Sequence, residues 1–91
     1  MKVNKDNIEC MIGKCFKNED EDGFAKIVEL LNKEEEILRI VYVGTGNDYF
    51  GIAIMEDNID SIDDEDKEIP EAEFRTEYDK VLKKLQHFVD L

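Results

Sequence analysis

The chain has few of the side chains from which proteins build metal sites. Its 91 residues include two cysteines, one histidine and no tryptophan. Cys10, Cys15 and His87 are together too few for a structural zinc site that uses only nitrogen and sulfur ligands. We therefore expect reduced cysteines that pack in the core, with a redox or disulfide role as the alternative. We expect neither a metal nor a cofactor.

Serine and histidine are too scarce for a nucleophile and its base. Ser61 and His87 are the only residues of their kinds, and His87 lies near the end of the sequence. A nucleophile and its base must lie within hydrogen-bonding reach, which this spacing does not favour. Carboxylates are plentiful, but exposed carboxylates have ordinary pKa values and do not single out an acid–base pair. We expect that the protein is not an enzyme.

Long apolar runs are also missing. The first ten residues, MKVNKDNIEC, hold no apolar run of the kind found in signal peptides. Nowhere does an apolar run approach the roughly 18 residues of a membrane span. We therefore expect a cytoplasmic protein. The length suits one domain with a modest core, and the apolar content of 42% is that of a folded chain.

Acidic side chains outnumber basic ones by 24 to 12, so the formal net charge is −12. The excess lies in two segments: Glu19 to Asp22 are four consecutive acids, and residues 56–73 hold ten acids and one lysine. The rest of the chain holds ten acids and eleven bases and is close to neutral. Such a field repels nucleic acids and anionic membranes and attracts basic surfaces. We exclude direct binding of nucleic acid or membrane and expect a basic protein as partner.

The first half of the chain predicts strands. Residues 1–10 form a short N-terminal segment, and residues 8–16 suit a helical turn that passes into a strand. Residues 23–31 and 35–44 are rich in isoleucine, valine and aromatics, which favours two strands around a polar turn. The alternative is one helix over residues 26–41, whose apolar residues also lie near one helical stripe. Glu34 falls on that stripe and argues against the helix.

The clearest hairpin joins residues 37–44 to residues 49–55 through the turn TGND, which is rich in residues that tolerate positive φ. In its second strand, Phe50, Ile52 and Ile54 alternate with Gly51 and Ala53. One face then packs on a core, and the small residues of the other face admit close approach by another element. The C-terminal helix is the natural candidate for that element.

Residues 70–90 predict an amphipathic helix that begins at Pro70, the only proline. Its apolar residues follow the 3-and-4 spacing of one helical face: Phe74, Tyr78, Val81, Leu82, Leu85, Phe88 and Val89. The predicted fold is α+β. It consists of a strongly bent antiparallel sheet of about four strands in residues 11–56, an acidic connection over residues 57–69, and this helix packed on the sheet. A closed form of the sheet would resemble the small barrels of Src-homology-3-like domains.

Residues 18–29, NEDEDGFAKIVE, resemble the calcium loop of the EF-hand family. Asn18, Asp20 and Asp22 occupy the first three ligand positions, Gly23 the turn, and Glu29 the last position. The resemblance implies a calcium-binding module. The alternative is a turn between two strands with its acids in solvent, which the β-favouring residues after Gly23 support.

The stretch EDNIDSIDDEDKEI differs from a simple acidic tail because Ile59, Ile62 and Ile69 interrupt it. We expect these isoleucines to hold the segment on the core with its carboxylates outward. In an extended chain, acids two residues apart lie about 6.6 Å apart on one face, a spacing like that of nucleic-acid phosphates. The predicted partner-binding residues are Glu19, Asp20, Glu21, Asp22, Asp57, Asp60, Asp63, Asp64, Glu65, Asp66 and Glu68.

In size and charge, and in the runs EDED and DDEDKE, the chain resembles the small acidic inhibitors of phages and mobile elements. These include anti-CRISPR proteins and other DNA mimics. The resemblance implies a viral protein in the host cytoplasm that blocks a basic, nucleic-acid-handling enzyme such as a CRISPR or other defence nuclease. The alternative is an immunity protein or partner subunit that binds a basic protein without mimicking nucleic acid. The sequence leaves the oligomeric state open.

Overall fold

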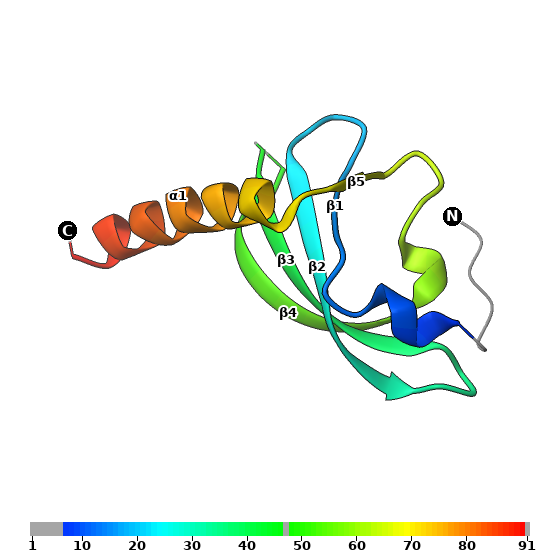
Figure 1. The fold of residues 1–91 in the computed structure, drawn as a ribbon. Helices are drawn as coiled ribbons and strands as arrows, with labels where there is room; N and C mark the ends of the chain where they lie inside the picture. The colour runs from blue at the N-terminus through cyan, green and yellow to red at the C-terminus, as the bar shows by residue number, and fades with distance from the viewer. Residues whose placement is uncertain (1–6, 47, 91) are drawn as a thin grey trace.

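The structure, a computed structural model, describes residues 7–46 and 48–90 (Figure 1). Residues 1–6 of the expected N-terminal segment and Asn47 of the expected TGND turn lie outside this part. In chain order the elements are the 3-10 helix η1 (Ile8–Met11), strands β1 (Cys15–Lys17), β2 (Gly23–Asn32), β3 (Ile37–Thr45) and β4 (Phe50–Asn58), the 3-10 helix η2 (Ile59–Ser61), strand β5 (Lys67–Ile69) and helix α1 (Glu71–Val89).

The predicted α+β class is confirmed. The strands form one antiparallel sheet in the order β4-β3-β2-β1-β5. The sheet is open, so the closed barrel form is wrong, and it has five strands because β5 pairs with β1. The helix alternative for residues 26–41 is also wrong. β2 and β3 form a hairpin across this region, with register shifts after Ile27 and Leu30 that bend it.

Each face of the sheet carries its own core. On one face, η1 and η2 cover a cluster formed by Ile8, Met11, Phe16, Ile27, Leu38, Ile40, Ile59 and Ile62. On the other face, α1 covers a cluster formed by Cys15, Phe24, Val43, Ile69, Phe74 and Val81. Cys15 is a free, buried thiol whose pKa is raised by burial, and Cys10 is free and exposed. A buried thiol behaves as a small apolar residue, which is the packing role expected for Cys15. The same expectation is wrong for Cys10, because its side chain lies on the exposed side of η1.

The position of the helix corrects one prediction. α1 packs beside Ile52, and Phe88 lies 6.3 Å from Phe50 between ring centroids. The helix therefore covers the face of Phe50 and Ile52 and not the small-residue face of Gly51 and Ala53. The large apolar side chains of β4 bury more surface against the helix than two small residues would, which explains the choice.

α1 crosses the sheet and extends past it. It contacts β1, β2, β3 and β4, and Figure 1 shows its C-terminal half projecting beyond the sheet. Phe74 and Val81 are buried, whereas Phe88 and Val89 are 53% and 83% exposed. The predicted helix is thus confirmed, but its apolar stripe is only partly covered. Among the described residues, no helix is both long enough and apolar enough to cross a membrane.

Candidate functional site: an acidic surface

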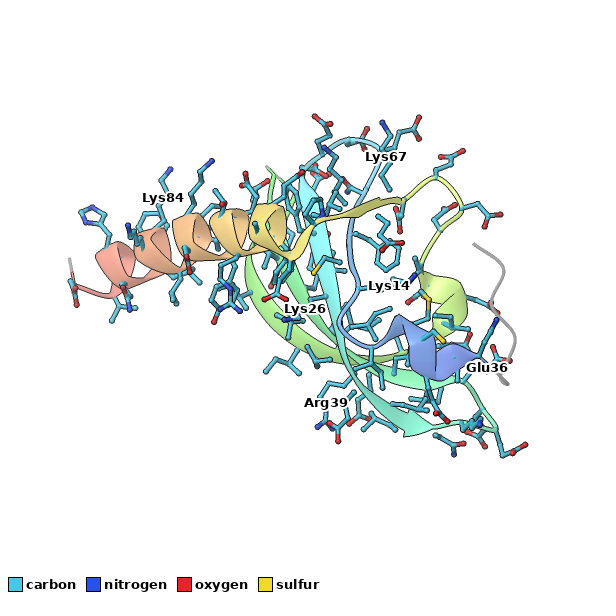
Figure 2. All side chains as sticks on the ribbon, in the orientation of Figure 1. Lys14, Lys26, Glu36, Arg39, Lys67 and Lys84 are labelled. Atoms are coloured by element: carbon cyan, nitrogen blue, oxygen red, sulfur yellow. The ribbon has the colours of Figure 1, made fainter. Side chains whose placement is uncertain are left out.

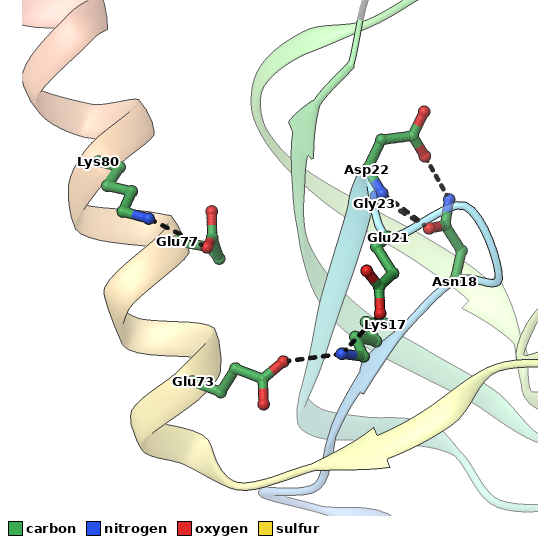
Figure 3. Close-up of polar contacts among 8 residues, drawn as sticks. All are labelled: Lys17, Asn18, Glu21, Asp22, Gly23, Glu73, Glu77 and Lys80. Carbon is green, nitrogen blue, oxygen red and sulfur yellow. Dashed lines mark hydrogen bonds and ion pairs between the residues drawn. The ribbon is translucent and has the colours of Figure 1, made fainter.

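The first acidic run forms the tight turn between β1 and β2. The side-chain oxygen of Asn18 accepts hydrogen bonds from the backbone N–H groups of Asp22 (3.0 Å) and Gly23 (3.2 Å). Its amide nitrogen donates to Asp22 Oδ1 at 2.7 Å. Figure 3 shows Asn18 facing Asp22 across the turn. One asparagine therefore fixes the turn and leaves Glu19 and Asp20 exposed at its tip.

The second acidic run is held on the core as predicted. Ile59, Ile62 and Ile69 are 5%, 6% and 8% exposed. Asn58 accepts a hydrogen bond from the backbone of Asp60, and its amide donates to the carbonyl of Glu35 at 2.9 Å. The prediction that the isoleucines anchor this segment is confirmed.

The backbone of the second run is not the extended chain assumed for phosphate-like spacing. Residues 59–61 form η2, and the residues that follow form a turn in which the N–H of Asp66 bonds the carbonyl of Asp63 at 3.0 Å. Side chains close this turn, because the carboxylates of Asp63 and Asp66 accept backbone N–H groups within it. Short acidic residues favour such turns, so local hydrogen bonding overrides the extended conformation.

The two acidic runs meet in space. The carboxyl group of Glu65, in the second run, is in hydrogen-bonding contact with that of Glu19, in the first. This contact raises the pKa of Glu65 above its ordinary value, and the nearby charges of Asp63 and Asp66 raise it further. Glu65 is thus an exception to the ordinary pKa values expected for exposed carboxylates. Segments more than forty residues apart in sequence build one surface.

The predicted partner-binding residues differ in whether a basic side chain lies beside them. Glu21 lies 3.1 Å from Lys17 Nζ, and Glu68 lies 3.5 Å from Lys14 Nζ. Within the described part of the chain, eight others have no ion pair with a base: Glu19, Asp20, Asp22, Asp57, Asp60, Asp63, Glu65 and Asp66. Asp64 is exposed and makes an interaction of its own. Among the described residues, most of these carboxylates therefore have no basic side chain that compensates their charge.

A pocket of about 220 Å³ opens beside this surface, on the sheet face opposite α1. Asp57 and Asp66 contribute carboxylates to its lining, and Tyr42 contributes an aromatic ring and a hydroxyl group. Burial raises the pKa of Tyr42, and the charge of Asp22 raises it further, so the hydroxyl stays protonated. The apolar part of the wall comes from Phe16, Phe24, Ala25, Ile40, Met55 and Ile62. A pocket with apolar walls and acidic groups suits a long side chain that ends in a cation.

The geometry does not support the calcium-loop alternative. β2 runs from Gly23 as a strand, so Glu29 lies about 20 Å along it, away from the turn. Glu29 instead accepts a hydrogen bond from Arg39 at 3.0 Å. In the residues that the structure describes, no group of three histidine, cysteine, aspartate or glutamate side chains is placed to hold a metal ion.

Sequence reasoning missed three residues of this site. Tyr42 was read only as a strand residue, although its position two residues before Gly44 in β3 points its ring to the face of Gly23. A side chain at position 23 would collide with the Tyr42 hydroxyl, since its Cβ would lie 2.5 Å away. Asn18 lies in a segment predicted as either a calcium loop or a turn between two strands; the turn is confirmed, but the role of Asn18 in closing it was not predicted. Lys17, which pairs with Glu21, had no predicted role either. The position of Asn18 directly before four acids is the one sequence signal for this turn, because asparagine favours turns.

Comparison with known proteins adds no relative. No protein-family model matches the chain, and no curated protein or solved structure matches it either.

Proposed function

We propose that the protein is a non-enzymatic acidic binding protein that blocks a basic, nucleic-acid-handling protein. The observation that carries this proposal is the pocket beside the two acidic turns, where Asp57 and Asp66 contribute carboxylates to a largely apolar wall. The charges of Asp63 and Asp66 also raise the pKa of Glu65, so ionised carboxylates of this surface repel one another. A cation from a partner would relieve that repulsion. The surface is thus poised to bind positive charge.

The neighbouring pocket gives the surface a specific contact. A lysine or arginine of the partner would place its apolar stem against Met55 and its charged group near Asp57 and Asp66. Interfaces gain most of their affinity from a few such anchored side chains and less from exposed rim charges. The exposed carboxylates of the two turns would then act mainly on the rate of association, which falls as salt rises.

Capture of the partner tests this proposal. The immobilised protein is incubated with lysate of its native host at low and high salt, and retained proteins are identified. We expect a basic nucleic-acid-binding protein that is lost at high salt, and lost also from the triple variant Glu19→Gln, Asp20→Asn, Glu65→Gln. The matched control, Glu35→Gln, Asp79→Asn, Asp90→Asn, removes three exposed acids elsewhere and should retain it. Equal capture by both triple variants would contradict the proposal.

One observation favours a second candidate, a partner subunit or immunity protein without nucleic-acid mimicry. The acids lie on two compact turns, not on one strand at the spacing of phosphates. Competition with DNA distinguishes the two candidates. Displacement of the captured partner by duplex DNA supports blocking of a nucleic-acid groove, and unchanged capture supports binding at another basic surface.

A further inference from the structure

The two edges of the sheet differ in how they are protected. β5, at one edge, is three residues long, contains Lys67 and is followed by Pro70. β4, at the other edge, is nine residues long and contains neither lysine nor proline. Short strands, lysine and proline are the usual means of preventing a sheet from pairing with another. β4 lacks all three and leaves its outer backbone groups without a strand partner in the described part of the chain.

β4 also exposes large apolar side chains, next to the acids Glu56 and Asp57. Ile54 is 70% exposed and Met55 is 39% exposed, both near the middle of the strand. Beyond this edge, α1 carries two more uncovered apolar side chains, Phe88 and Val89. Since α1 crosses the sheet and continues past it, a strand added to β4 would lie beneath the projecting helix (Figure 1). The added strand would cover the edge, and the helix would cover the strand.

We propose that this strand is β4 of a second copy, so that the protein forms a twofold dimer with one continuous ten-stranded sheet. The two β4 strands pair antiparallel about an axis near Ile54. The two helices then lie on the same face. They do not collide, because the Phe50 and Asn58 ends of β4 are about 26 Å apart and a helix is about 10 to 12 Å wide.

Charge complementarity favours a second copy of the chain as the partner that pairs with β4. Lys84 Nζ lies 5.9 Å from the centre of the Phe50 ring, so the basic half of α1 is at the Phe50 end of β4. Neither Lys83 nor Lys84 has an ion pair among the described residues. Antiparallel pairing places the Phe50 end of one copy beside the Asn58 end of the other. Lys83 and Lys84 then lie near Glu56 of the second copy.

Glu56 is on the correct face for this contact. It alternates with Met55 and Asp57 and shares the helix-covered face of the sheet with Arg39, which lies 3.0 Å from it. Figure 2 shows Lys84 on the projecting helix and Arg39 toward the end of the sheet that is farther from the helix. A twofold axis makes this contact twice, which gives the self-complementarity that a symmetric dimer requires.

The mass in solution tests the inference. Sedimentation equilibrium from about 1 to about 200 µM covers the range of a weak dimer, and we expect twice the chain mass of 10.6 kDa at the upper end. Ile54→Lys and Val89→Lys both change exposed side chains and should weaken association at least tenfold. Ile12→Lys is the control, since Ile12 is 46% exposed in the turn after η1, away from β4, and should leave the dimer intact.

Reversing the charges at the proposed contact tests how the two copies are oriented in the dimer. Lys83→Glu with Lys84→Glu should weaken the dimer, and so should Glu56→Lys, because each creates like-charge contacts across the axis. Mixing these two variants should restore a dimer that contains one chain of each kind. A wild-type chain that stays monomeric at about 200 µM overturns the inference, as does a dimer that tolerates Ile54→Lys. A monomer that instead takes up an extended segment of another protein at β4 overturns it as well.

The tests of dimerisation do not depend on the proposed function. The triple variant Glu19→Gln, Asp20→Asn, Glu65→Gln changes only the acidic turns and should dimerise as the wild type does. Ile54→Lys should still capture the basic partner, because Ile54 lies on the face of the sheet that carries α1 and the pocket opens on the opposite face.

Discussion

Lys17 Nζ lies 3.3 Å from Glu73 Oε2, and this ion pair ties the start of the acidic surface to the first turn of α1. The same nitrogen lies 3.1 Å from Glu21, in the β1–β2 turn (Figure 3). One basic side chain therefore positions a turn and a helix relative to each other. The hydrogen bonds to Glu21 and Glu73 raise the pKa of Lys17 above its ordinary value.

Lys17→Met should leave the fold intact and lower its stability. The variant keeps an apolar stem at this position but removes the cation between Glu21 and Glu73. Since both partners are partly exposed, the loss should be modest and should shrink as salt is raised. Urea unfolding at low and high salt measures both effects. A loss of stability that is equal at both salt concentrations would show that Lys17 acts through packing.

The raised pKa of Glu65 predicts a pH dependence of stability. An acid whose pKa is higher in the folded state than in the unfolded state binds its proton more tightly in the folded state. Proton binding then contributes to stability below the unfolded pKa, and this contribution is lost as the pH rises through the folded pKa. Glu65→Gln removes a carboxylate that contacts Glu19 and is repelled by Asp63 and Asp66, and it should stabilise the protein at pH 7. The gain should vanish as pH falls below the ordinary value of 4.5.

Thermal unfolding of wild type and Glu65→Gln between pH 3.5 and 7 checks this prediction. Asp60→Asn is the control, because Asp60 is exposed and outside the contact with Glu19. Its effect should not share the pH profile of Glu65→Gln. If Glu65→Gln gives the same change at every pH, the two carboxyl groups do not interact in solution.

Asn18→Ala should loosen the β1–β2 turn. The substitution removes the acceptor for two backbone N–H groups, a loss that costs about 1 to 2 kcal/mol in comparable capping positions. Asn18→Asp retains the acceptor and should be closer to wild type. Amide hydrogen exchange at Asp22 and Gly23 reports the turn directly. Unchanged protection in Asn18→Ala would mean that other contacts hold these amides.

Ile62→Ala should release the second acidic run from the core. Ile62 is 6% exposed and packs in the cluster on the face opposite α1, so truncation should destabilise the protein by about 2 to 4 kcal/mol. The backbone of residues 63–66 should become mobile on the nanosecond timescale, as measured by NMR relaxation. Ile12→Ala, at an exposed position, provides the comparison. A rigid turn in Ile62→Ala would show that its hydrogen bonds alone suffice.

The predictable parts of the fold are those with a local periodic signal. The spacing from Phe74 to Val89 indicated α1, and the β-branched residues around Tyr42 indicated the central hairpins. β5 was missed because three residues, KEI, carry no readable period. The face covered by α1 was predicted wrongly because small residues admit a neighbour, but the larger burial at Ile52 determines where the helix packs.

The candidate site was likewise predictable only where the sequence carries a local signal. The anchoring of Ile59 and Ile62 followed from apolar residues inside an acidic run. The contact of Glu19 with Glu65 depends on the pairing of β5 with β1, a relation between distant segments that composition does not encode. The turn at Asp63 and Asp66 departs from the predicted extended conformation because aspartate carboxylates accept hydrogen bonds from the nearby backbone.

The pairing of Cys15 with Ile69 joins residues 54 positions apart, whereas β1, β2, β3 and β4 pair with their immediate neighbours in the chain. Closing a long loop carries an entropic cost that short hairpins avoid, so β5 should dock after the four-stranded meander has formed. In any earlier folding intermediate, the two acidic turns would therefore not yet lie side by side. The chain would acquire its anionic surface only in the last step of folding.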